Sequence, residues 1–423
     1  MSSPAPRVPE LPEITHEPPR NRSRTDPCHS CHICDSVCPV TPVNADFQGP
    51  KSQGPQEWRL RDGGVSVDYS IAACTNCLQC HGACPADVDL MALHTEARAT
   101  HVEERGLSLR SLRDRLLANY GLLARIGSRF PRLSNWLMDN GVIRSLAEST
   151  LGITAEREAP EFAQETFREW WAARGGPRVQ SEQKRVAYFH GDHANYHQPA
   201  VGKSLVRVYE HLGYEVRVPE QRCSGAPMVA NGHLEDAERV TRKNVESFEP
   251  YIEAGYDVIA TCTSCSLTLR ETNPREFDVD GVDRLAANTY DAVEYLRMQD
   301  ELADLELDSA ALPDALSYHA PCHARDQGVD GAALPALRAA GVEVAHLGDD
   351  CSGMSGTYGW KEERYEDSMA IGEDLFAAAE AVEAEASLTE CPTCGMQLEH
   401  GTDEETIHPI EVLSAGLDGR RNV

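Results

Sequence analysis

CHSCHICDSVCP (residues 28–39) and CTNCLQCHGACP (residues 74–85) are two copies of one cysteine pattern, and they decide the fold of the N-terminal region. In each copy three cysteines are separated by two residues each. A fourth cysteine follows after three more residues and directly precedes a proline. Eight of the fifteen cysteines of the 423-residue chain belong to these two copies.

This spacing is typical of [4Fe–4S] cluster sites. Three thiolates at this spacing wrap one face of the cubane, and the fourth, held by the proline turn, reaches the neighbouring cluster. We therefore predict two [4Fe–4S] clusters. One would be bound by Cys28, Cys31, Cys34 and Cys84, and the other by Cys74, Cys77, Cys80 and Cys38. Zinc is the alternative, although tetrahedral zinc sites usually pair two CxxC units without the fourth spacing or the proline. Two such clusters carry single electrons and perform no organic chemistry alone.

The C-terminal half contains an internal repeat. Three segments recur at offsets of 128 to 130 positions: Cys262–Cys265 with Cys391–Cys394, Cys223-Ser-Gly with Cys351-Ser-Gly, and His190–His193 with Ala320–His323. Three anchors at nearly one offset predict a duplicated module.

The two copies differ in their thiols. The second supplies four, Cys322, Cys351, Cys391 and Cys394, enough for a four-thiolate iron–sulfur site. Zinc is a competitor there, and structural thiols without metal are the third alternative. The first supplies only Cys223, Cys262 and Cys265, with Asp192 at the position of Cys322. Because a carboxylate is a harder ligand than a thiolate, we expect the first copy to be empty or to lose iron readily.

Each copy alternates like an α/β unit. Residues 186–189 predict a strand, the stretch through Leu205 and Leu212 predicts a helix closed by Gly213, and residues 214–218 alternate like a second strand. Another helix is expected to end near Gly255, and residues 257–261 lead as a strand into the first CxxC. The cysteines therefore fall where strands end, the edge at which open α/β sheets place their sites. For His190, His193 and His197 we expect loop hydrogen bonding rather than metal binding.

The segment between the cysteine-rich parts is basic. Residues 105–132 contain one acidic residue, Asp114, and seven arginines: Arg105, Arg110, Arg113, Arg115, Arg125, Arg129 and Arg132. Leu109, Leu112, Leu116, Tyr120 and Leu123 recur at steps of three and four, which predicts a helical apolar stripe. A basic amphipathic helix can bind an anionic membrane or an acidic partner. The alternative is a helix packed on the chain's own acidic C-terminal part.

Composition excludes some classes of protein. Asp and Glu number 68 against 39 Lys and Arg, for a net charge of −29, which disfavours nucleic acid as a partner. Only five of the basic residues are Lys, a bias that fits a halophile, although a GC-rich genome would also favour Arg.

We find no transmembrane segment and no signal-peptide core. Fifteen cysteines in an unexported chain then favour metal or redox chemistry over disulfides.

Several longer segments carry a family resemblance. They are Gly49-Pro-Lys-Ser-Gln-Gly-Pro, Phe189-His-Gly-x-x-x-Asn-Tyr, Cys223-x-Gly-x-Pro, Ala230-Asn-Gly, Tyr318-His-x-Pro-Cys-His and Gly356-Thr-Tyr-Gly. Together with the two cysteine motifs they make the chain, from about residue 26, resemble the C subunits of the anaerobic glycerol-3-phosphate dehydrogenases. The wider family includes the iron–sulfur subunit of glycolate oxidase and cysteine-rich subunits of heterodisulfide reductase.

The resemblance implies an electron-transfer subunit without an alcohol-oxidising site of its own. Its partners would be the flavin-containing A and B subunits of the dehydrogenase, which oxidise glycerol 3-phosphate, and a membrane quinone. The protein would be peripheral, on the cytoplasmic side of the cell membrane. In the family the repeated module has a C…CC…CxxC pattern. Ser224 and Ser352 replace the second Cys of each CC pair here, and Asp192 replaces the first Cys of copy one, so an unusual noncubane cluster is not expected.

We predict a multi-domain chain that combines a helical dicluster domain with α/β modules. The division is a disordered tail (1–25), a ferredoxin-like dicluster domain (26–100), a basic amphipathic helical linker (101–180) and two cysteine-rich α/β repeats (181–305 and 306–423). Two alternative functions stay open. One is the iron–sulfur subunit of a glycolate or lactate oxidase or of a heterodisulfide-reductase-like complex. The other is a zinc-stabilised scaffold or regulatory protein.

Overall fold

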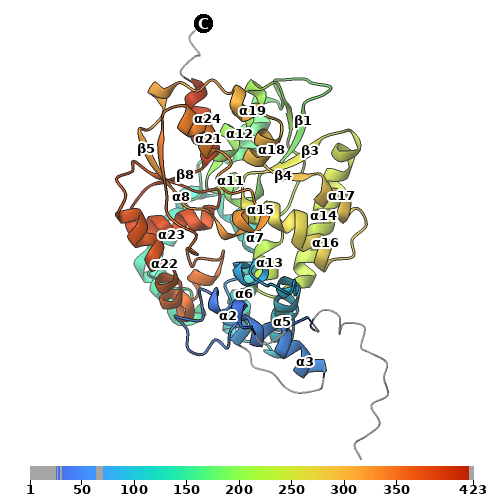
Figure 1. Ribbon diagram of the computed structural model, residues 1–423, viewed down its shortest axis with the longest axis vertical. Helices are drawn as coiled ribbons and strands as arrows, with labels where there is room; N and C mark the ends of the chain where they lie inside the picture. Colours follow the sequence, from blue (N-terminus) through green and yellow to red (C-terminus); the bar gives the residue numbers. More distant parts are fainter. Residues whose placement is uncertain (1–24, 26, 29–30, 63–69, 419–423) are drawn as a thin grey trace, which may run out of the picture.

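A computed structural model describes Thr25, residues 27–28, 31–62 and 70–418. The expected disordered tail, residues 1–25, lies outside the described residues except for Thr25. The N-terminal cysteine region lies at one end of the molecule, and the two α/β modules lie beside each other at the other end (Figure 1).

The N-terminal region consists of short helices joined by tight loops. They are α2 (Ile33–Ser36), the π-helix η1 (Ser52–Gln56), α3 (Glu57–Asp62), the 3₁₀-helix η2 (Ser70–Ala73), α4 (Gln79–Gly82) and α5 (Leu90–Glu104). The one long helix, α5, begins where the Asp89 side chain accepts a hydrogen bond from the Ala92 N–H at 3.0 Å. Leu90, Leu93 and Ala97 of this helix are buried, so α5 packs the cysteine loops against the rest of the protein.

The middle of the chain is helical, as predicted. It forms α6 (Leu109–Ala118), α7 (Tyr120–Gly127), α8 (Pro131–Asp139), α9 (Gly141–Leu151) and α10 (Phe167–Arg174). Side-chain caps define the starts of several of them, for example Ser108 before α6 and Asn140 before α9.

The first module is built on a parallel sheet of order β2-β1-β3-β4. Its strands are β1 (Arg185–Phe189), β2 (Glu215–Arg217), β3 (Asp257–Ala260) and β4 (Thr289–Asp291). Its helices are α11 (Gly191–Tyr196), α12 (Pro199–His211), α13 (Ala226–Ala230), α14 (Leu234–Glu253), α15 (Thr263–Leu267), η3 (Thr268–Thr272), α16 (Asn273–Glu276), α17 (Val282–Ala287), α18 (Ala292–Met298) and α19 (Glu301–Asp304). The three expected strands and two expected helices are confirmed, and Gly213 has the left-handed φ of +85° that ends α12.

The second module repeats this order as β6-β5-β7-β8, again all parallel. Its strands are β5 (Ala315–Tyr318), β6 (Glu343–His346), β7 (Ser387–Leu388) and β8 (Thr406–Ile407). Its helices are η4 (Ser309–Ala311), α20 (Cys322–Gln327), α21 (Leu334–Ala339), η5 (Tyr358–Trp360), η6 (Glu362–Arg364), α22 (Tyr365–Glu380), α23 (Pro392–Thr402) and α24 (Pro409–Asp418). The predicted duplication is therefore present as two sheets of identical topology.

One apolar core spans both modules. Val186 of β1 and Leu205 of α12 belong to the same buried cluster as Leu316 of β5 and Leu413 of α24, and α12 packs directly against α24. Phe167 of α10 is fully buried in this cluster as well. The cysteine-bearing ends of the two sheets are thus held in one fixed relation.

Candidate iron–sulfur centres

The structure brings several cysteines of the two N-terminal motifs close to one another. The Cys34 thiol lies close enough to Cys28 and Cys84 to interact electrostatically with both, although burial is the largest cause of its raised pKa. The Cys38 thiol likewise interacts electrostatically with Cys74, and burial is again the largest cause of its raised pKa. The fourth cysteine of each motif therefore lies beside at least one cysteine of the other motif, Cys84 beside Cys34 and Cys38 beside Cys74. Cys80 adjoins both sets, because it interacts with Cys77 and Cys74 and also with Cys34.

The loops around these thiols have the shape of a cluster cradle. His32 and Leu78, which follow the second cysteine of their respective motifs, both adopt left-handed conformations with φ of 58° and 64°. Polar N–H groups point at sulfur: Asn76 N–H at 3.5 Å and the Arg98 guanidinium at 2.9 Å from Cys74 Sγ, and Val88 N–H at 3.4 Å from Cys84 Sγ. Such donors stabilise thiolates bound to iron.

The electrostatics of the thiols fit a cationic group. Burial raises the pKa of Cys34 to about 12 and that of Cys38 to about 11, so that neither would ionise alone at neutral pH. Iron ions would supply the positive charge that keeps such thiols deprotonated. All fifteen cysteines are free thiols. No three His, Cys, Asp or Glu side chains in the described residues converge into a site for a single metal ion.

The segment Gly49–Pro55 braces the first motif. Its Lys51 N–H donates to the Asp35 carboxylate at 3.0 Å, and the His94 side chain of α5 bonds the Pro50 carbonyl at 2.8 Å. Gly49 has a φ of +87°, and a Cβ there would stand 2.7 Å from the Asp35 carboxylate. This segment contributes to the family resemblance, but its text alone does not predict that it ties the first cysteine loop to α5.

The four thiols of the second module lie at the carboxyl edge of its sheet. Cys322 opens α20 after β5, Cys351 follows β6, and Cys391 and Cys394 lie after β7 at the start of α23. The Ser352 hydroxyl donates to Cys394 Sγ at 3.3 Å, so this serine, which replaces a family cysteine, contacts a candidate ligand directly. Hydrogen bonds from Cys394 and Thr393 lower the pKa of Cys391 to about 5 despite its burial.

The first module has the corresponding site with one carboxylate. Asp192 follows β1 and hydrogen-bonds Cys223, and burial raises the pKa of its carboxyl to about 6. Cys223 in turn interacts with Cys262, and Cys265 with Cys262 and Ser224. Gly191 lies beside this site with a left-handed φ of +63°, which favours glycine there. The substitution of a cysteine by Asp192 thus falls inside the candidate ligand set.

The candidate sites contact one another. Cys77 of the second N-terminal motif is within hydrogen-bonding reach of Cys351, and this contact is the largest cause of its raised pKa. His323 links three regions, because Nε2 lies 2.9 Å from the Asn76 carbonyl oxygen and Nδ1 lies 2.9 Å from the Ser264 hydroxyl. The Ser264 hydroxyl also lies 3.9 Å from Cys391 Sγ. Sequence reasoning missed His323 as a bridge, although it stands next to Cys322 in the resemblance motif.

Of the three clustered histidines, His190 and His197 take part in loop hydrogen bonding as expected, whereas His193 Nδ1 has no hydrogen-bond partner among the described residues. His190 Nδ1 bonds the Gly191 carbonyl oxygen at 2.6 Å, and His197 Nδ1 bonds the Glu161 carbonyl oxygen at 2.8 Å while its Nε2 contacts the Tyr120 hydroxyl. His193 lies beside His197, with ring centroids 5.2 Å apart and the two rings tilted by 48°.

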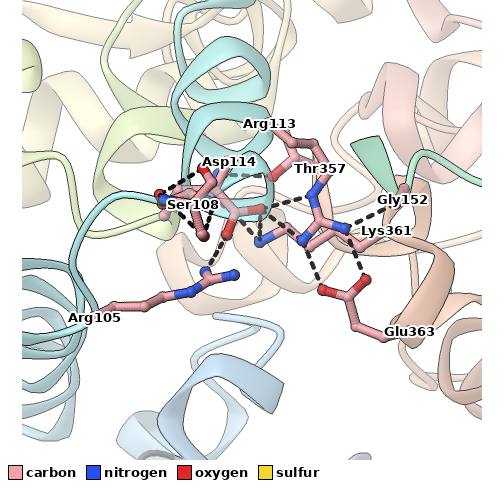
Figure 2. A network of polar contacts seen from close by, with 10 residues as sticks. Arg105, Ser108, Arg113, Asp114, Gly152, Thr357, Lys361 and Glu363 are labelled. Atoms are coloured by element: carbon pink, nitrogen blue, oxygen red, sulfur yellow. Dashed lines mark hydrogen bonds and ion pairs between the residues drawn. The ribbon is translucent and has the colours of Figure 1, made fainter. Parts of the chain in front are cut away.

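The basic segment packs some of its arginines on the chain itself. Arg113 of α6 is completely buried, bonds the Gly152 carbonyl at 2.8 Å and pairs with Asp114 and Glu363 (Figure 2). Lys361 Nζ lies 3.3 Å from Asp114, and Arg105 closes the network at 2.5 Å (Figure 2). Arg115 pairs with Asp236 of the first module at 3.4 Å. Packing on the chain's own acidic C-terminal part is therefore confirmed for Arg113 and Arg115, whereas Arg105 pairs with Asp114 of the basic segment itself.

The apolar side chains of the same helices are exposed. The apolar surface of α6–α9 consists of Leu109, Leu112, Leu122, Leu123, Ile126, Phe130, Leu133, Trp136, Leu137, Val142, Ile143 and Leu146. Exposed large apolar side chains on several neighbouring helices are typical of interaction surfaces. Among the described residues, no helix combines the length and the apolar composition needed to cross a lipid bilayer.

Comparisons with known proteins agree with the two cysteine constellations. Residues 24–88 match a 4Fe-4S dicluster domain, and residues 186–270 and 316–399 each match a cysteine-rich domain. The chain is 34% identical over 403 residues to the C subunit of the anaerobic glycerol-3-phosphate dehydrogenase of Escherichia coli K12, covering 94% of this chain and all of that protein. It is 25% identical to the B subunit of the fumarate reductase (CoM/CoB) of Methanothermobacter marburgensis, over 92% of this chain and 70% of that one. A probable glycolate oxidase iron-sulfur subunit of Bacillus subtilis is 24% identical over 89% of both chains.

Proposed function

This chain belongs to the family of the C subunit of anaerobic glycerol-3-phosphate dehydrogenase, an iron–sulfur electron-transfer protein, and from that membership we propose that it carries electrons from the flavin-containing A and B subunits to a membrane quinone. The flavin subunits would oxidise glycerol 3-phosphate, and this chain would have no alcohol-oxidising site.

The observation that carries the proposal is the contact between Cys77 and Cys351. It joins the N-terminal cysteines to those of the second module, as a relay requires. We assign one [4Fe–4S] cluster to Cys28, Cys31, Cys34 and Cys84, one to Cys74, Cys77, Cys80 and Cys38, and a third iron–sulfur cluster to Cys322, Cys351, Cys391 and Cys394. When bound, these clusters would accept and release single electrons. His323 would support the relay by fixing the second N-terminal loop against both modules.

We propose further that the apolar surface of α6–α9 holds the protein at the cytoplasmic face of the membrane as a peripheral subunit. The support is the set of exposed large side chains, among them Phe130 and Trp136, at 68% and 59% exposure. Residues of this kind enter the interfacial region of a bilayer from helices that lie in its plane. The arginines that pair with carboxylates of the chain itself are not needed for binding to the membrane.

A second candidate is the iron–sulfur subunit of a glycolate or lactate oxidase. The likeness to the probable glycolate oxidase iron-sulfur subunit over 89% of both chains favours keeping it. The two candidates differ only in the substrate of the partner subunits, so the substrate that reduces the purified complex distinguishes them.

The test uses the intact complex purified through this chain. We expect Cys77→Ala to abolish quinone reduction by glycerol 3-phosphate, because it removes a cluster ligand at the contact with Cys351. Reduction of a soluble dye at the flavin should survive. Ser36→Ala is the matched control, since Ser36 is exposed within the first motif and its hydroxyl donates to the Ile33 carbonyl oxygen of the same short helix. Loss of dye reduction in an assembled Cys77→Ala complex would contradict the separation of the two roles.

A further inference from the structure

A cavity of about 460 Å³ lies between the middle helices and the two cysteine-rich modules. Leu117 of α6, Leu123 of α7 and Met138 of α8 line it from one side. His190 lines it from the modules, together with Cys77 of the N-terminal region and all seven cysteines of the modules: Cys223, Cys262, Cys265, Cys322, Cys351, Cys391 and Cys394. Its size is within the range of cavities that hold small organic ligands, and its lining is mostly apolar.

The cavity adjoins the exposed apolar surface of α6–α9. Leu123 belongs to both, because it lines the cavity and is 41% exposed. Its neighbours Leu122 and Ile126 on α7 are each 63% exposed. An apolar molecule held at that surface would therefore need to pass only one layer of helices to enter.

Helix α7 lies directly against the cysteine site of the first module. A Cβ added at Gly121 would collide with the Asp192 carboxylate, so only glycine allows α7 to approach so closely. Asp192 in turn hydrogen-bonds Cys223. One side chain, Asp192, therefore separates this helix from the nearest candidate ligand thiol.

The cavity also contains a buried polar atom that nothing satisfies. His190 is only 5% exposed, and its Nε2 has no hydrogen-bond partner within the described part of the chain. Its Nδ1 is held by the Gly191 carbonyl oxygen, which makes Nδ1 the protonated nitrogen and leaves Nε2 as an acceptor. A buried acceptor in an apolar cavity is suited to a ligand that carries a hydroxyl group.

From these four observations we propose that the part of this cavity between α7 and the first module, beside the cluster assigned to the second module, is the site at which an isoprenoid quinone is reduced, an inference that rests on the proposed function. The quinone would enter from the apolar surface of α6–α9. Its two carbonyl groups would become hydroxyl groups by uptake of two electrons, delivered singly from the iron–sulfur centres, and of two protons from water. His190 Nε2 would accept the hydrogen bond of one product hydroxyl. The apolar surface of α6–α9 would hold the isoprenoid tail, and His190 would bind the polar ring. Together they account for a cavity that lies between an apolar surface and a cysteine site.

The test measures binding rather than turnover. An alkyl hydroxyquinoline N-oxide, whose fluorescence is quenched when it enters a quinone site, is titrated into the intact cluster-bearing protein in detergent. Leu123→Trp and Met138→Trp fill the cavity from two different helices. Arg125→Trp is the matched control, because Arg125 is exposed on α7 and does not line the cavity. Iron content and the visible spectrum report on folding in every variant.

We expect the wild type and Arg125→Trp to bind the probe equally, and the two cavity variants to bind it at least about tenfold more weakly with unchanged iron content. Equal binding by all four proteins, or equal loss in Arg125→Trp, would overturn the proposed site and leave the electron-transfer function standing. Absence of binding to the wild type, together with failure of quinone to reoxidise the substrate-reduced complex, would overturn the function itself. If both cavity variants lose probe binding only together with iron, the result would also count against the site. It would show that Leu123 and Met138 are needed to keep the iron–sulfur region folded rather than to bind quinone.

Discussion

Arg113 and Glu363, 250 residues apart in the chain, form a two-pronged ion pair in which the guanidinium nitrogens Nη1 and Nη2 donate to the two carboxylate oxygens at 2.7 and 2.6 Å. Arg113 is completely buried, whereas Glu363 retains 29% exposure of its side chain. The pair fastens α6 to the second module beside η6, and it uses an arginine that the sequence places among seven apparently equivalent basic residues.

Removing this arginine should destabilise the protein strongly. Arg113→Met would remove the ion-pair partner of Glu363 and one of the three cations around Asp114, and loss of charged hydrogen bonds at a partly buried pair costs about 1–3 kcal/mol. Denaturant unfolding of the intact protein measures the change in the free energy of unfolding. Arg110→Met, at an exposed position of the same helix, should change it by less than about 0.5 kcal/mol. Similar losses in the two variants would contradict the role assigned to the pair.

The same network should make stability depend on pH in the acid range. Burial alone would raise the pKa of Glu363, but the hydrogen bonds and charge of Arg113 outweigh it and hold the pKa below its ordinary value of 4.5. A depressed carboxyl pKa contributes stability that is fully present above the ordinary value and is lost as pH falls through the lower, folded-state value. Glu363→Gln should therefore flatten the decline in unfolding free energy below about pH 4.5. Glu362→Gln, its exposed neighbour, should keep the full slope.

Iron content tests the difference between the two modules. Two clusters in the N-terminal region and one in the second module give about 12 iron ions per anaerobically purified chain. Asp192→Cys completes a four-thiolate set with Cys223, Cys262 and Cys265 and should raise the content to about 16, whereas Asp192→Asn should not. Elemental analysis decides between the outcomes. About 8 iron ions with stoichiometric zinc in the wild type would assign the second module to zinc, and about 16 would show that the first module already binds a cluster with Asp192 in place.

Membrane binding should depend on the apolar surface of α6–α9 rather than on its arginines. The double variant Leu133→Asp and Trp136→Asp removes two side chains that are 55% and 59% exposed. Because burying each such side chain is worth about 1.5–3 kcal/mol, binding to vesicles of anionic phospholipid should weaken by at least about 100-fold. The loss should persist in multimolar salt, where contributions from surface charges are screened. Met298→Asp replaces an exposed apolar residue of α18 and is expected to bind normally. Equal sedimentation of both variants with vesicles would argue that this surface binds something else.

Short-range patterns in the sequence predicted much of the architecture. The cysteine spacing indicated the two N-terminal loops, and the recurrence of three anchors indicated two modules, which have the same strand order. Strands such as Asp257–Ala260 could be placed because their apolar runs are bounded by turn residues. The cysteine motifs and the strands depend on neighbours within a few residues, and the repeat is found by comparing two stretches of the same sequence, so all of them can be recognised without a structure.

Contacts across long separations were not predictable in the same way. The amphipathic pattern of 105–132 shows that apolar and basic residues alternate. It does not show which of the arginines are buried and which are exposed, because both kinds fit the pattern. Only the fold reveals that Arg113 meets Glu363, or that His323 bridges Asn76 and Ser264. The contact between Cys77 and Cys351 belongs to the same class, because it depends on how three regions dock.

The single interior shared by the two modules has a consequence for how this protein could have been assembled in evolution. Leu205 and Leu413 are buried in one cluster, so a gene divided near the connection to β5 would yield two half-proteins, each with a broad apolar wall facing water. Neither product would be soluble until it met the other. A single module could cover this apolar wall only by packing against a second copy, and the duplicated chain makes that contact within itself. Within one chain the two copies can differ, with a thiol at Cys322 in one and a carboxylate at Asp192 in the other. Because they share one core, both copies still fold and unfold together.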